Sequence, residues 1–288
     1  MDDIDRYLCK LSDRFSRIDP KQYYLAYSGG KDSHLLFWFI KEYAKIPNIK
    51  VMGVITRLEP KEIADRIRKN SDYVMMSQLE PHEIKELYGS PCFSKIQDEF
   101  IKRYQAGSRS DNTLKFIMGY NPIFRLSDKA RELLLADKLP KISSNCCKYL
   151  KKEPTKRFNK ETGLKAILGV RADEGQTRKA KYTSYMTKDK TFTPIYDLSD
   201  ELEQKIYKKY DIELPKIYAY VRRTGCLGCP YAKRNVNDVR NIERELMLAD
   251  GQLFDFACDY FNESYKVLGV DVASIKERRL KDGKQAIA

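Results

Sequence analysis

The stretch YYLAYSGGKDS at residues 23–33 constrains the fold more than any other part of the sequence. Its apolar run ends in two glycines, and residues 31–46 then carry apolar side chains over a helical length. An apolar run at 49–56, a helical pattern at 59–70 and a third apolar run at 72–79 continue the alternation. Strands and helices that alternate at this spacing form right-handed crossovers and a parallel sheet. We therefore predict an α/β protein, a Rossmann-like α/β/α sandwich around a parallel sheet.

The sequence before and after this core is expected to be mostly helical. Residues 1–22 read as an N-terminal amphipathic helix, because apolar side chains recur there at helical spacing. Residues 23–175 read as the nucleotide-binding α/β domain, which ends with a later strand. Residues 176–288 read as a mostly helical region that carries a Cys-x-x-Cys motif and ends in the basic tail KERRLKDGKQ.

Charge and hydropathy restrict the location and the partners. The 288 residues include 54 Lys and Arg against 41 Asp and Glu, a formal charge of +13. This excess favours an anionic partner such as a nucleotide, a nucleic acid or an acidic protein, although a lysine-rich solvated surface would also explain it. The longest apolar run, LLFWFI, is far shorter than the roughly 20 residues that cross a bilayer. We expect a cytoplasmic protein that does not enter membranes.

The glycine loop follows the first strand, where parallel sheets bind ligands beyond the carboxyl ends of their strands. Two glycines allow a sharp turn and a close approach to an anion, and the next helix directs its free N–H groups to the same place. A lysine supplies a countercharge, whereas Asp32 suggests either a bound metal such as Mg²⁺ or a structural bond to the loop. The candidate nucleotide-binding residues are Ser28, Gly29, Gly30, Lys31, Asp32 and Ser33.

Two better-known phosphate loops do not fit this stretch. A Walker A loop needs four residues between its glycines, and here the glycines are adjacent. A dinucleotide GxGxxG pattern is absent for the same reason. An ordinary strand-to-helix turn remains open, because serine, glycine and aspartate are common in turns.

Four of the seven cysteines occur in two pairs. One pair is adjacent, and the other has the spacing Cys-x-x-Cys, 78 residues further on (148–225 lie between them). Zinc is the usual metal for two Cys-x-x-Cys pairs, but neighbouring cysteines diverge and suit a larger cluster with separate irons. We predict an iron–sulfur cluster in preference to zinc, with four ligands: Cys146, Cys147, Cys226 and Cys229.

The loop SGGKDS resembles the pyrophosphate loop, S-G-G-x-D-S, of the PP-loop ATP pyrophosphatases and of the related APS and PAPS (adenylyl-sulfate and phosphoadenylyl-sulfate) reductases. The resemblance implies a HUP-type fold that holds an adenine nucleotide, ATP with Mg²⁺ or alternatively APS or PAPS. In the ATP-using members a substrate oxygen attacks the α-phosphorus and pyrophosphate leaves. Catalytic roles for Lys31 and Asp32 follow from this resemblance.

The cysteine pairs resemble the [4Fe–4S] site of APS reductases, whose first pair reads CC-x-x-R-K-x-x-P. Lys151 and Pro154 fall at the lysine and proline positions, and Leu150 replaces the arginine. The resemblance implies that Lys151 contacts the bound cofactor.

Two further segments resemble the same family. GVRADEGQTR at 169–178 is similar to its basic loop, which implies catalytic roles for Arg171 and Arg178 in holding phosphate or sulfate oxygens. TRLEP at 56–60 ends the second strand, where the family contacts adenine and ribose, so Thr56 is a further candidate. A plain helix start explains TRLEP equally well.

One element of the reductase pattern is missing, the E-C-G-[IL]-H segment with its nucleophilic cysteine. The last cysteine, Cys258 in LFDFACDYF, is expected to pack in a core. We therefore expect an ATP pyrophosphatase that adenylylates an acceptor and supports sulfur transfer, similar to phage and mobile-element PAPS-reductase-like proteins and to DNA-phosphorothioation enzymes. Expected partners are a nucleic-acid acceptor and a cysteine desulfurase or other sulfur donor. The alternatives are an APS or PAPS reductase that forms sulfite, or a nucleic-acid-binding module with a structural cluster.

Overall fold

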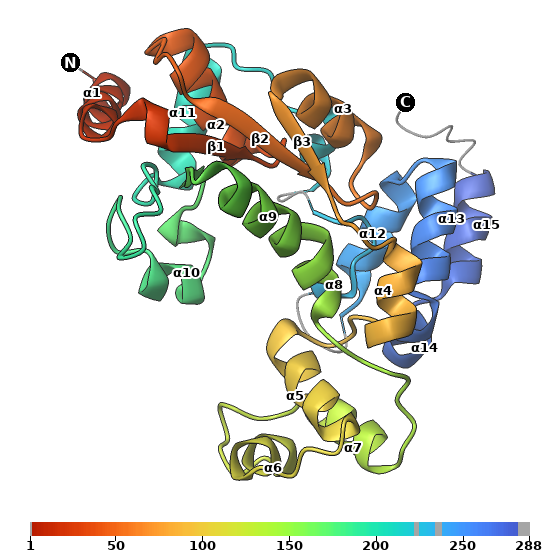
Figure 1. The fold of residues 1–288 in the computed structure, drawn as a ribbon. Helices are drawn as coiled ribbons and strands as arrows, with labels where there is room; N and C mark the ends of the chain where they lie inside the picture. Colours follow the sequence, from red (N-terminus) through yellow and green to blue (C-terminus); the bar gives the residue numbers. More distant parts are fainter. Residues whose placement is uncertain (1, 222–224, 234–237, 282–288) are drawn as a thin grey trace. The chain divides into compact units, whose positions relative to one another are not determined.

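A computed structural model describes the chain except residues 1, 222–224, 234–237 and 282–288 (Figure 1). The chain forms two compact units. The sheet unit contains Met1–Ile55, Glu62–Met76 and Pro154–Arg223, and the helical unit contains Thr56–Lys61, Ser77–Glu153 and Thr224–Ala288. Each unit contains three segments, because the chain leaves and re-enters it. The predicted boundaries at residues 22 and 175 stay predictions.

The sheet has four strands in the order β3-β2-β1-β4, and every pairing is parallel. Leu25 in the central strand lies opposite Val51 on one side and Ile167 on the other. The bounds are β1 Tyr23–Tyr27, β2 Lys50–Ile55, β3 Tyr73–Met76 and β4 Lys165–Leu168. The predicted parallel α/β sheet is confirmed, and the loop after β1 leaves from the middle of the sheet.

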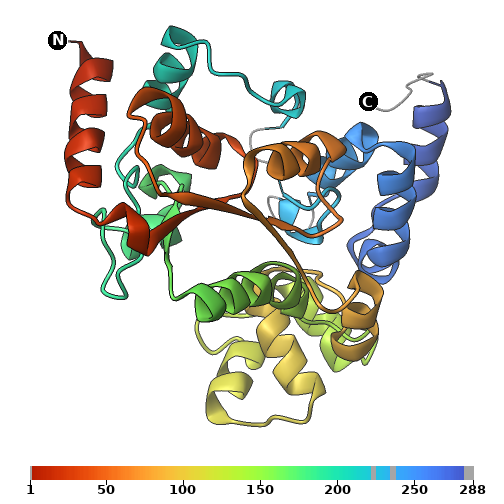
Figure 2. The same cartoon turned by 45° about the horizontal axis from the view of Figure 1, so that its top comes forward.

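Helices cover both faces of this sheet, as Figure 2 shows from a second direction. Tyr24 stacks edge-on against Phe158 of α9 on one face, in a core that also contains Met52 and Ala166. Tyr27 points to the other face, where its hydroxyl meets His34 of α2. The covering helices are α1 Asp3–Ser16, α2 Lys31–Trp38, α3 Lys61–Asn70, α9 Glu153–Thr162 and α11 Asp200–Lys209. This is the predicted sandwich.

Alternation of side chains explains why the central strand is buried on both faces. Tyr24, Leu25 and Tyr27 are each exposed by 2% or less. A strand of this kind reads as a continuous apolar run, because successive side chains enter opposite layers. α2 then continues through a π-helical turn at Phe39–Tyr43, whose first two residues are fully buried.

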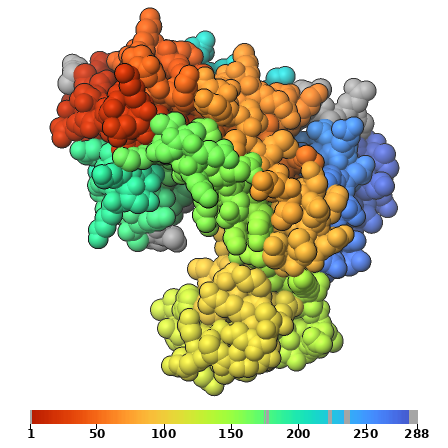
Figure 3. Space-filling view, viewed as in Figure 1, coloured from red at the N-terminus to blue at the C-terminus, as the bar shows by residue number. Residues whose placement is uncertain are grey.

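The helical unit contains no strand among its described residues. Phe100, Phe116 and Phe124 pack together at 4.0–5.8 Å between ring centres and hold α5 against α6. Figure 3 shows this part of the surface in yellow. The helices are α4 Pro81–Tyr88, α5 Lys95–Gln105, α6 Asp111–Met118, α7 Asp128–Leu135, α8 Asn145–Cys147, α12 Arg240–Leu248, α13 Gly251–Tyr260, α14 Asn262–Leu268 and α15 Val272–Lys281. The predicted helical C-terminal region is confirmed.

The predictions for the basic tail and for the location of the protein are tested only in part by the described residues. The basic tail lies in α15 as far as Lys281, and its remaining residues are outside the described part of the chain. Within the described residues, no helix is both long enough and apolar enough to cross a membrane. The cytoplasmic location stays a prediction.

Candidate nucleotide loop and thiol cluster

The loop between β1 and α2 is built by its glycines and serines. Gly29 has φ +71°, and a side chain there would come within 3.1 Å of the Ile63 carbonyl oxygen, so glycine fits best. The Ser33 hydroxyl accepts the Ser28 amide at 3.2 Å, lies 3.0 Å from the Ser28 hydroxyl and donates to the Gly30 carbonyl. These bonds fix a turn that ends at the N-terminus of α2, as the sequence predicts for residues 28–33.

The basic loop at 169–178 packs directly against this turn. Gly169 follows β4, and a Cβ atom there would lie 2.8 Å from the Ser33 nitrogen and from the Asp32 carbonyl carbon. The absence of a side chain therefore lets the two loops touch. Two residues later, Arg171 enters the protein with only 1% of its surface exposed.

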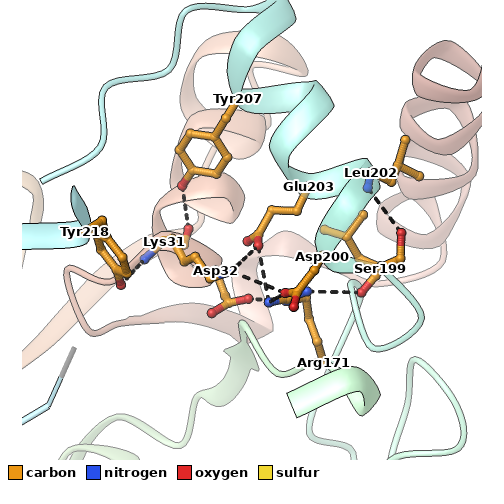
Figure 4. A network of polar contacts seen from close by, with 10 residues as sticks. Lys31, Asp32, Arg171, Ser199, Asp200, Leu202, Glu203, Tyr207 and Tyr218 are labelled. Atoms are coloured by element: carbon orange, nitrogen blue, oxygen red, sulfur yellow. Dashed lines mark hydrogen bonds and ion pairs between the residues drawn. The ribbon is translucent and has the colours of Figure 1, made fainter. Parts of the chain in front are cut away.

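Arg171 connects the loop to α11, as Figure 4 shows. Its guanidinium is paired with the Asp32 carboxylate and lies 2.6 Å from Asp200 Oδ1 and 3.2 Å from Glu203 Oε2. Burial opposes the charge of Arg171, but Asp32, Glu203 and Asp200 outweigh it and raise the pKa of the guanidinium. Of the two roles open for Asp32, a structural bond is the one observed.

Lys31 belongs to the same network. Its ammonium lies 2.7 Å from Glu203 Oε2 and 3.4 Å from Asp200 Oδ1. The backbone of Lys31 is held separately: its N–H donates to the Tyr218 hydroxyl at 2.9 Å, and its carbonyl accepts from Tyr207 at 2.6 Å (Figure 4). The first turn of α2 is thus fixed by side chains more than 160 positions away in the sequence.

The sequence analysis did not identify the side chains that hold this turn. Asp200 and Glu203 lie in the first turn of α11, where acids favour the helix dipole, and the Ser199 hydroxyl caps that helix by accepting the Leu202 amide. Tyr207 and Tyr218 belong to no motif in the sequence. Complete burial of Glu203, at 1% exposure, was the unexpected feature, because glutamates are rarely buried without partners.

The other predicted phosphate ligand, Arg178, lies in α10 (Gln176–Lys181) and is half-buried. Arg171 forms ion pairs with carboxylates and so stabilises the loop through Asp32. To bind phosphate or sulfate directly, its guanidinium would have to break these ion pairs. Both catalytic assignments stay predictions.

All four predicted ligand cysteines belong to the helical unit. Cys146 and Cys147 form α8, and Cys226 and Cys229 lie in a turn before α12. Burial and then the neighbouring Cys226 raise the pKa of Cys146 to about 12. Burial and the same neighbour also raise the pKa of Cys229, with smaller contributions from Cys146 and Cys147. The thiols of the two pairs therefore lie close enough to influence one another, and their role as ligands stays a prediction.

Lys151 lies in the π-helical turn Lys148–Lys152 that follows α8. Negative charge on Cys226, Cys147 and Cys229 raises the pKa of its ammonium, which hydrogen-bonds Cys226. The side chain keeps access to solvent. Lys151 thus lies among the thiols, where a cation favours their ionised form.

Four thiols could hold either a single metal ion or an iron–sulfur cluster, and the two make different demands on geometry. In the part of the chain that the structure describes, no group of three or more His, Cys, Asp or Glu side chains is placed to hold a single metal ion. A cluster makes a different demand, because each thiolate binds its own iron. The Tyr260 hydroxyl is buried beside the Cys146 thiol: burial and then the charge of, and hydrogen bonding with, that thiol raise its pKa, while among the described residues it has no partner of ordinary hydrogen-bond geometry. A soft, thiolate-bound group with sulfur acceptors suits this donor set.

The Cys-x-x-Cys turn is held by groups outside the thiols. Gly228 has φ +68°; its N–H donates to Glu245 at 2.9 Å and its carbonyl accepts from Tyr265 at 2.6 Å. A side chain at Gly228 would come within 2.5 Å of the Tyr265 hydroxyl and 2.8 Å of Leu246. Burial raises the pKa of Glu245 to about 8, although its hydrogen bond from the Gly228 N–H acts to lower it. The turn is therefore preformed by the protein.

A second anchor follows the turn. The Lys233 ammonium donates to the carbonyls of Cys92, Phe93 and Pro230 at 2.5–2.7 Å. Cys92 is fully buried, and burial raises the pKa of its thiol, which suits a structural residue. Its loop also donates two N–H groups to the buried Asp98.

Thr56, predicted to contact the nucleotide, lies in the helical unit. Its hydroxyl donates to the Glu59 carboxylate and is 3.8 Å from the sulfur of Cys226. A backbone hydrogen bond from the Leu227 amide to the Leu58 carbonyl, at 2.7 Å, also joins TRLEP to the Cys-x-x-Cys turn. TRLEP thus supports the thiol turn, and a nucleotide contact by Thr56 stays a prediction.

A hollow of about 350 Å³ lies between α1 and α11. It is lined by charged side chains of both signs, including Arg6, Lys10 and Glu201, and by no residue predicted from the motifs. It is therefore not a candidate for the nucleotide site.

No family model matches the sequence, and no curated protein matches it. Among solved structures, the chain is similar to a PAPS reductase from Candida auris in a phosphate complex, with TM-score 0.40 and 10% identity over 74% of this chain and 89% of that one. It is also similar to the U34-tRNA thiolase NcsA from Methanococcus maripaludis with its [4Fe–4S] cluster (TM-score 0.38, 14% identity, 99% and 81% covered).

A third similar structure is an NH3-dependent NAD synthetase from Campylobacter jejuni subsp. jejuni NCTC 11168 in complex with the nitrate ion. Its TM-score is 0.34 and its identity 13%, over 92% of this chain and 94% of that one. Identities and scores this low say nothing about activity, so the function is argued below from the residues themselves.

Proposed function

We propose that the protein is a PP-loop ATP pyrophosphatase that adenylylates an acceptor and supports sulfur transfer with a [4Fe–4S] cluster. The observation that carries the proposal is the loop Ser28–Ser33, which joins the central strand of a parallel sheet to the N-terminus of a helix. Backbone N–H groups and a helix dipole favour phosphate at such a place. The sequence S-G-G-K-D-S resembles the pyrophosphate loop in every defined position.

The reaction would place the triphosphate of ATP, with its Mg²⁺, on this loop. An acceptor oxygen attacks the α-phosphorus, the bond to the bridging oxygen breaks, and pyrophosphate carries away the negative charge. Lys31 is the cation nearest to the loop on α2 and would stabilise the leaving phosphates. The loop serines and Arg171 would keep that helix turn rigid.

Cys146, Cys147, Cys226 and Cys229 would hold the cluster, which when bound would position or deliver sulfur. Lys151 would offset the charge of the thiolates, and the Tyr260 hydroxyl would donate toward sulfur. The excess positive charge supports a nucleic-acid acceptor, and the sulfur would come from a cysteine desulfurase or another donor.

The experiment incubates the anaerobically reconstituted protein with ATP and Mg²⁺, with and without nucleic acid, and measures pyrophosphate. A parallel incubation with APS or PAPS and thioredoxin measures sulfite. We expect pyrophosphate; sulfite without pyrophosphate would identify a sulfonucleotide reductase instead. Neither product, with nucleic-acid binding intact, would favour a binding module with a structural cluster.

A matched pair of variants tests the loop itself. Lys31→Met should weaken ATP binding by about 10- to 100-fold, the loss of one hydrogen bond to a charged group. Lys205→Met removes an exposed lysine of α11 that pairs with Glu201, and should leave affinity unchanged. Equal affinity in both variants would contradict binding at this loop.

A further inference from the structure

Five charged side chains meet behind the first turn of α2, and their charges do not balance (Figure 4). The two cations are Lys31 and Arg171, and the three acids are Asp32, Asp200 and Glu203. Among these five described side chains, the acids outnumber the cations by one when all are ionised. Arg171 and Glu203 are each only 1% exposed, so water screens this excess poorly.

Glu203 is the acid that carries the excess. Its Oε2 atom accepts from Lys31 at 2.7 Å and lies 3.2 Å from Arg171. Its Oε1 atom is buried and has no hydrogen-bond partner in the described part of the chain. An ionised carboxylate with one unsatisfied oxygen is costly, whereas a protonated carboxyl is neutral. Burial, and then the negative charge of Asp32, raise the pKa of Glu203 to about 7, although Arg171 and Lys31 act to lower it.

The other groups around Glu203 are committed elsewhere. Arg171 is held by Asp32 and Asp200, and the Tyr207 hydroxyl donates to the Lys31 carbonyl. Lys31 is different, because its ammonium ends a flexible side chain on the first residue of α2. The nucleotide phosphates of the proposed function would compete for that ammonium with a larger charge than one carboxylate offers.

We propose that Glu203 holds Lys31 in the nucleotide-free protein and gives it up to the phosphates of the nucleotide, taking up one proton from the solvent as it does so. The inference rests on the proposed function, since it requires a nucleotide on the loop. Losing the ammonium leaves Glu203 buried beside Asp32 and near new negative charge, and both changes favour its protonated form. Glu203 is thus a positioning residue that couples nucleotide binding to pH.

The test is calorimetric titration of the holoprotein with Mg²⁺ and a non-hydrolysable ATP analogue between pH 7 and pH 8.5. Two buffers of different ionisation enthalpy report the protons taken up. Wild-type protein should take up about half a proton at pH 7 and close to one above about pH 8, and its affinity should fall by up to about tenfold per pH unit above pH 7. Glu203→Gln should take up no proton, and its affinity should not vary with pH.

Glu201→Gln is the matched control. Glu201 lies on the same helix, 78% exposed, and pairs with Lys205, so its loss should leave the wild-type proton uptake intact. A merely structural role for Glu203 would change affinity at every pH alike and would not abolish uptake.

Two failures are distinguishable. Nucleotide binding without proton uptake, or uptake that persists in Glu203→Gln, overturns the inference and leaves the proposed function standing. No nucleotide binding by the wild type overturns both. If Glu203→Gln does not fold, infrared difference spectra of the wild type decide: a protonated carboxyl band must appear on binding, and its absence overturns the inference.

Discussion

The loop of the sheet unit and the thiols of the helical unit both gather charge deep in the protein, but they satisfy it differently. In the loop, Lys31 and Arg171 meet acids at 2.6–3.4 Å, so the protein supplies both signs itself. Around the thiols, Lys151 is one of the described cations, burial raises the pKa of Cys146 and Cys229, and the Tyr260 hydroxyl lies beside Cys146.

This difference indicates what each region does. A network that contains its own counterions can exchange one of them for a ligand, which is how we expect Lys31 to act. Thiols with raised pKa values stay protonated until a group that binds thiolates displaces their protons. The predictions below test this contrast.

The largest effect is expected at the thiols. Cys146→Ser or Cys229→Ser should abolish the cluster, measured as iron and sulfide content and anaerobic absorbance. Cys9→Ser, an exposed cysteine of α1, should retain both. A colourless wild-type protein that contains only zinc would contradict the cluster.

The next largest effect concerns the buried pairs of the loop. Arg171→Met removes the buried cation that pairs with Asp32, Asp200 and Glu203, and should lower the free energy of unfolding by about 3–5 kcal/mol in urea denaturation. Arg17→Met, which breaks a surface pair with Asp13 at 2.9 Å, should cost about 0–1 kcal/mol. Similar costs for the two would show that the loop network is not a stabilising core.

The preformed Cys-x-x-Cys turn is tested by two glycines of similar backbone conformation. Gly228 (φ +68°) would bring a side chain against Tyr265 and Leu246, whereas Gly163 (φ +70°) has nothing within 4 Å. Both alanine variants carry the left-handed strain, about 1–2 kcal/mol. Gly228→Ala should lose roughly 1–3 kcal/mol more in thermal unfolding. An equal loss would indicate that the turn can move.

A smaller effect is the pH dependence of stability. The pKa of Glu203 is about 7 in the folded protein against an ordinary 4.5, so the folded state binds the proton more tightly than the unfolded state. The unfolding free energy should therefore fall as pH rises from 4.5 to 7, by at most about 1.4 kcal/mol per pH unit from this group. Asp98 and Glu245 act in the same direction.

Glu203→Gln should reduce this slope in urea titrations at successive pH values. Glu201→Gln should not, because Glu201 is exposed and its pKa is lowered by Lys205. If the slope of unfolding free energy against pH is unchanged in Glu203→Gln, the pH dependence would come from Asp98 and Glu245 instead.

The smallest effect is expected at Tyr260. A hydroxyl that donates to cluster sulfur stabilises the reduced, more negative state, so Tyr260→Phe should make the reduction potential more negative. Tyr265→Phe is the control, because its hydroxyl already donates to Gly228. Anaerobic redox titration measures both, and an equal potential in Tyr260→Phe and wild type would rule out a bond from this hydroxyl.

Local sequence determined the parts of the protein that depend on neighbouring residues. The apolar run at β1, the glycines at 29 and 30 and the helix after them predicted the strand, the turn and the parallel sheet, because φ preferences and side-chain periodicity act over a few positions. The cysteine spacing likewise picked out four thiols that influence one another in the fold, and the cluster they would hold stays a prediction.

Tertiary structure decided what those groups contact. Nothing near Lys31 in the sequence indicates Glu203, and Tyr260 gives no local sign that it will lie beside Cys146. Arg171 looked like a phosphate ligand, and folding placed it among carboxylates. The physical reason is that a motif specifies backbone shape and charge type locally, whereas desolvation and ion pairing depend on which distant segments pack around them.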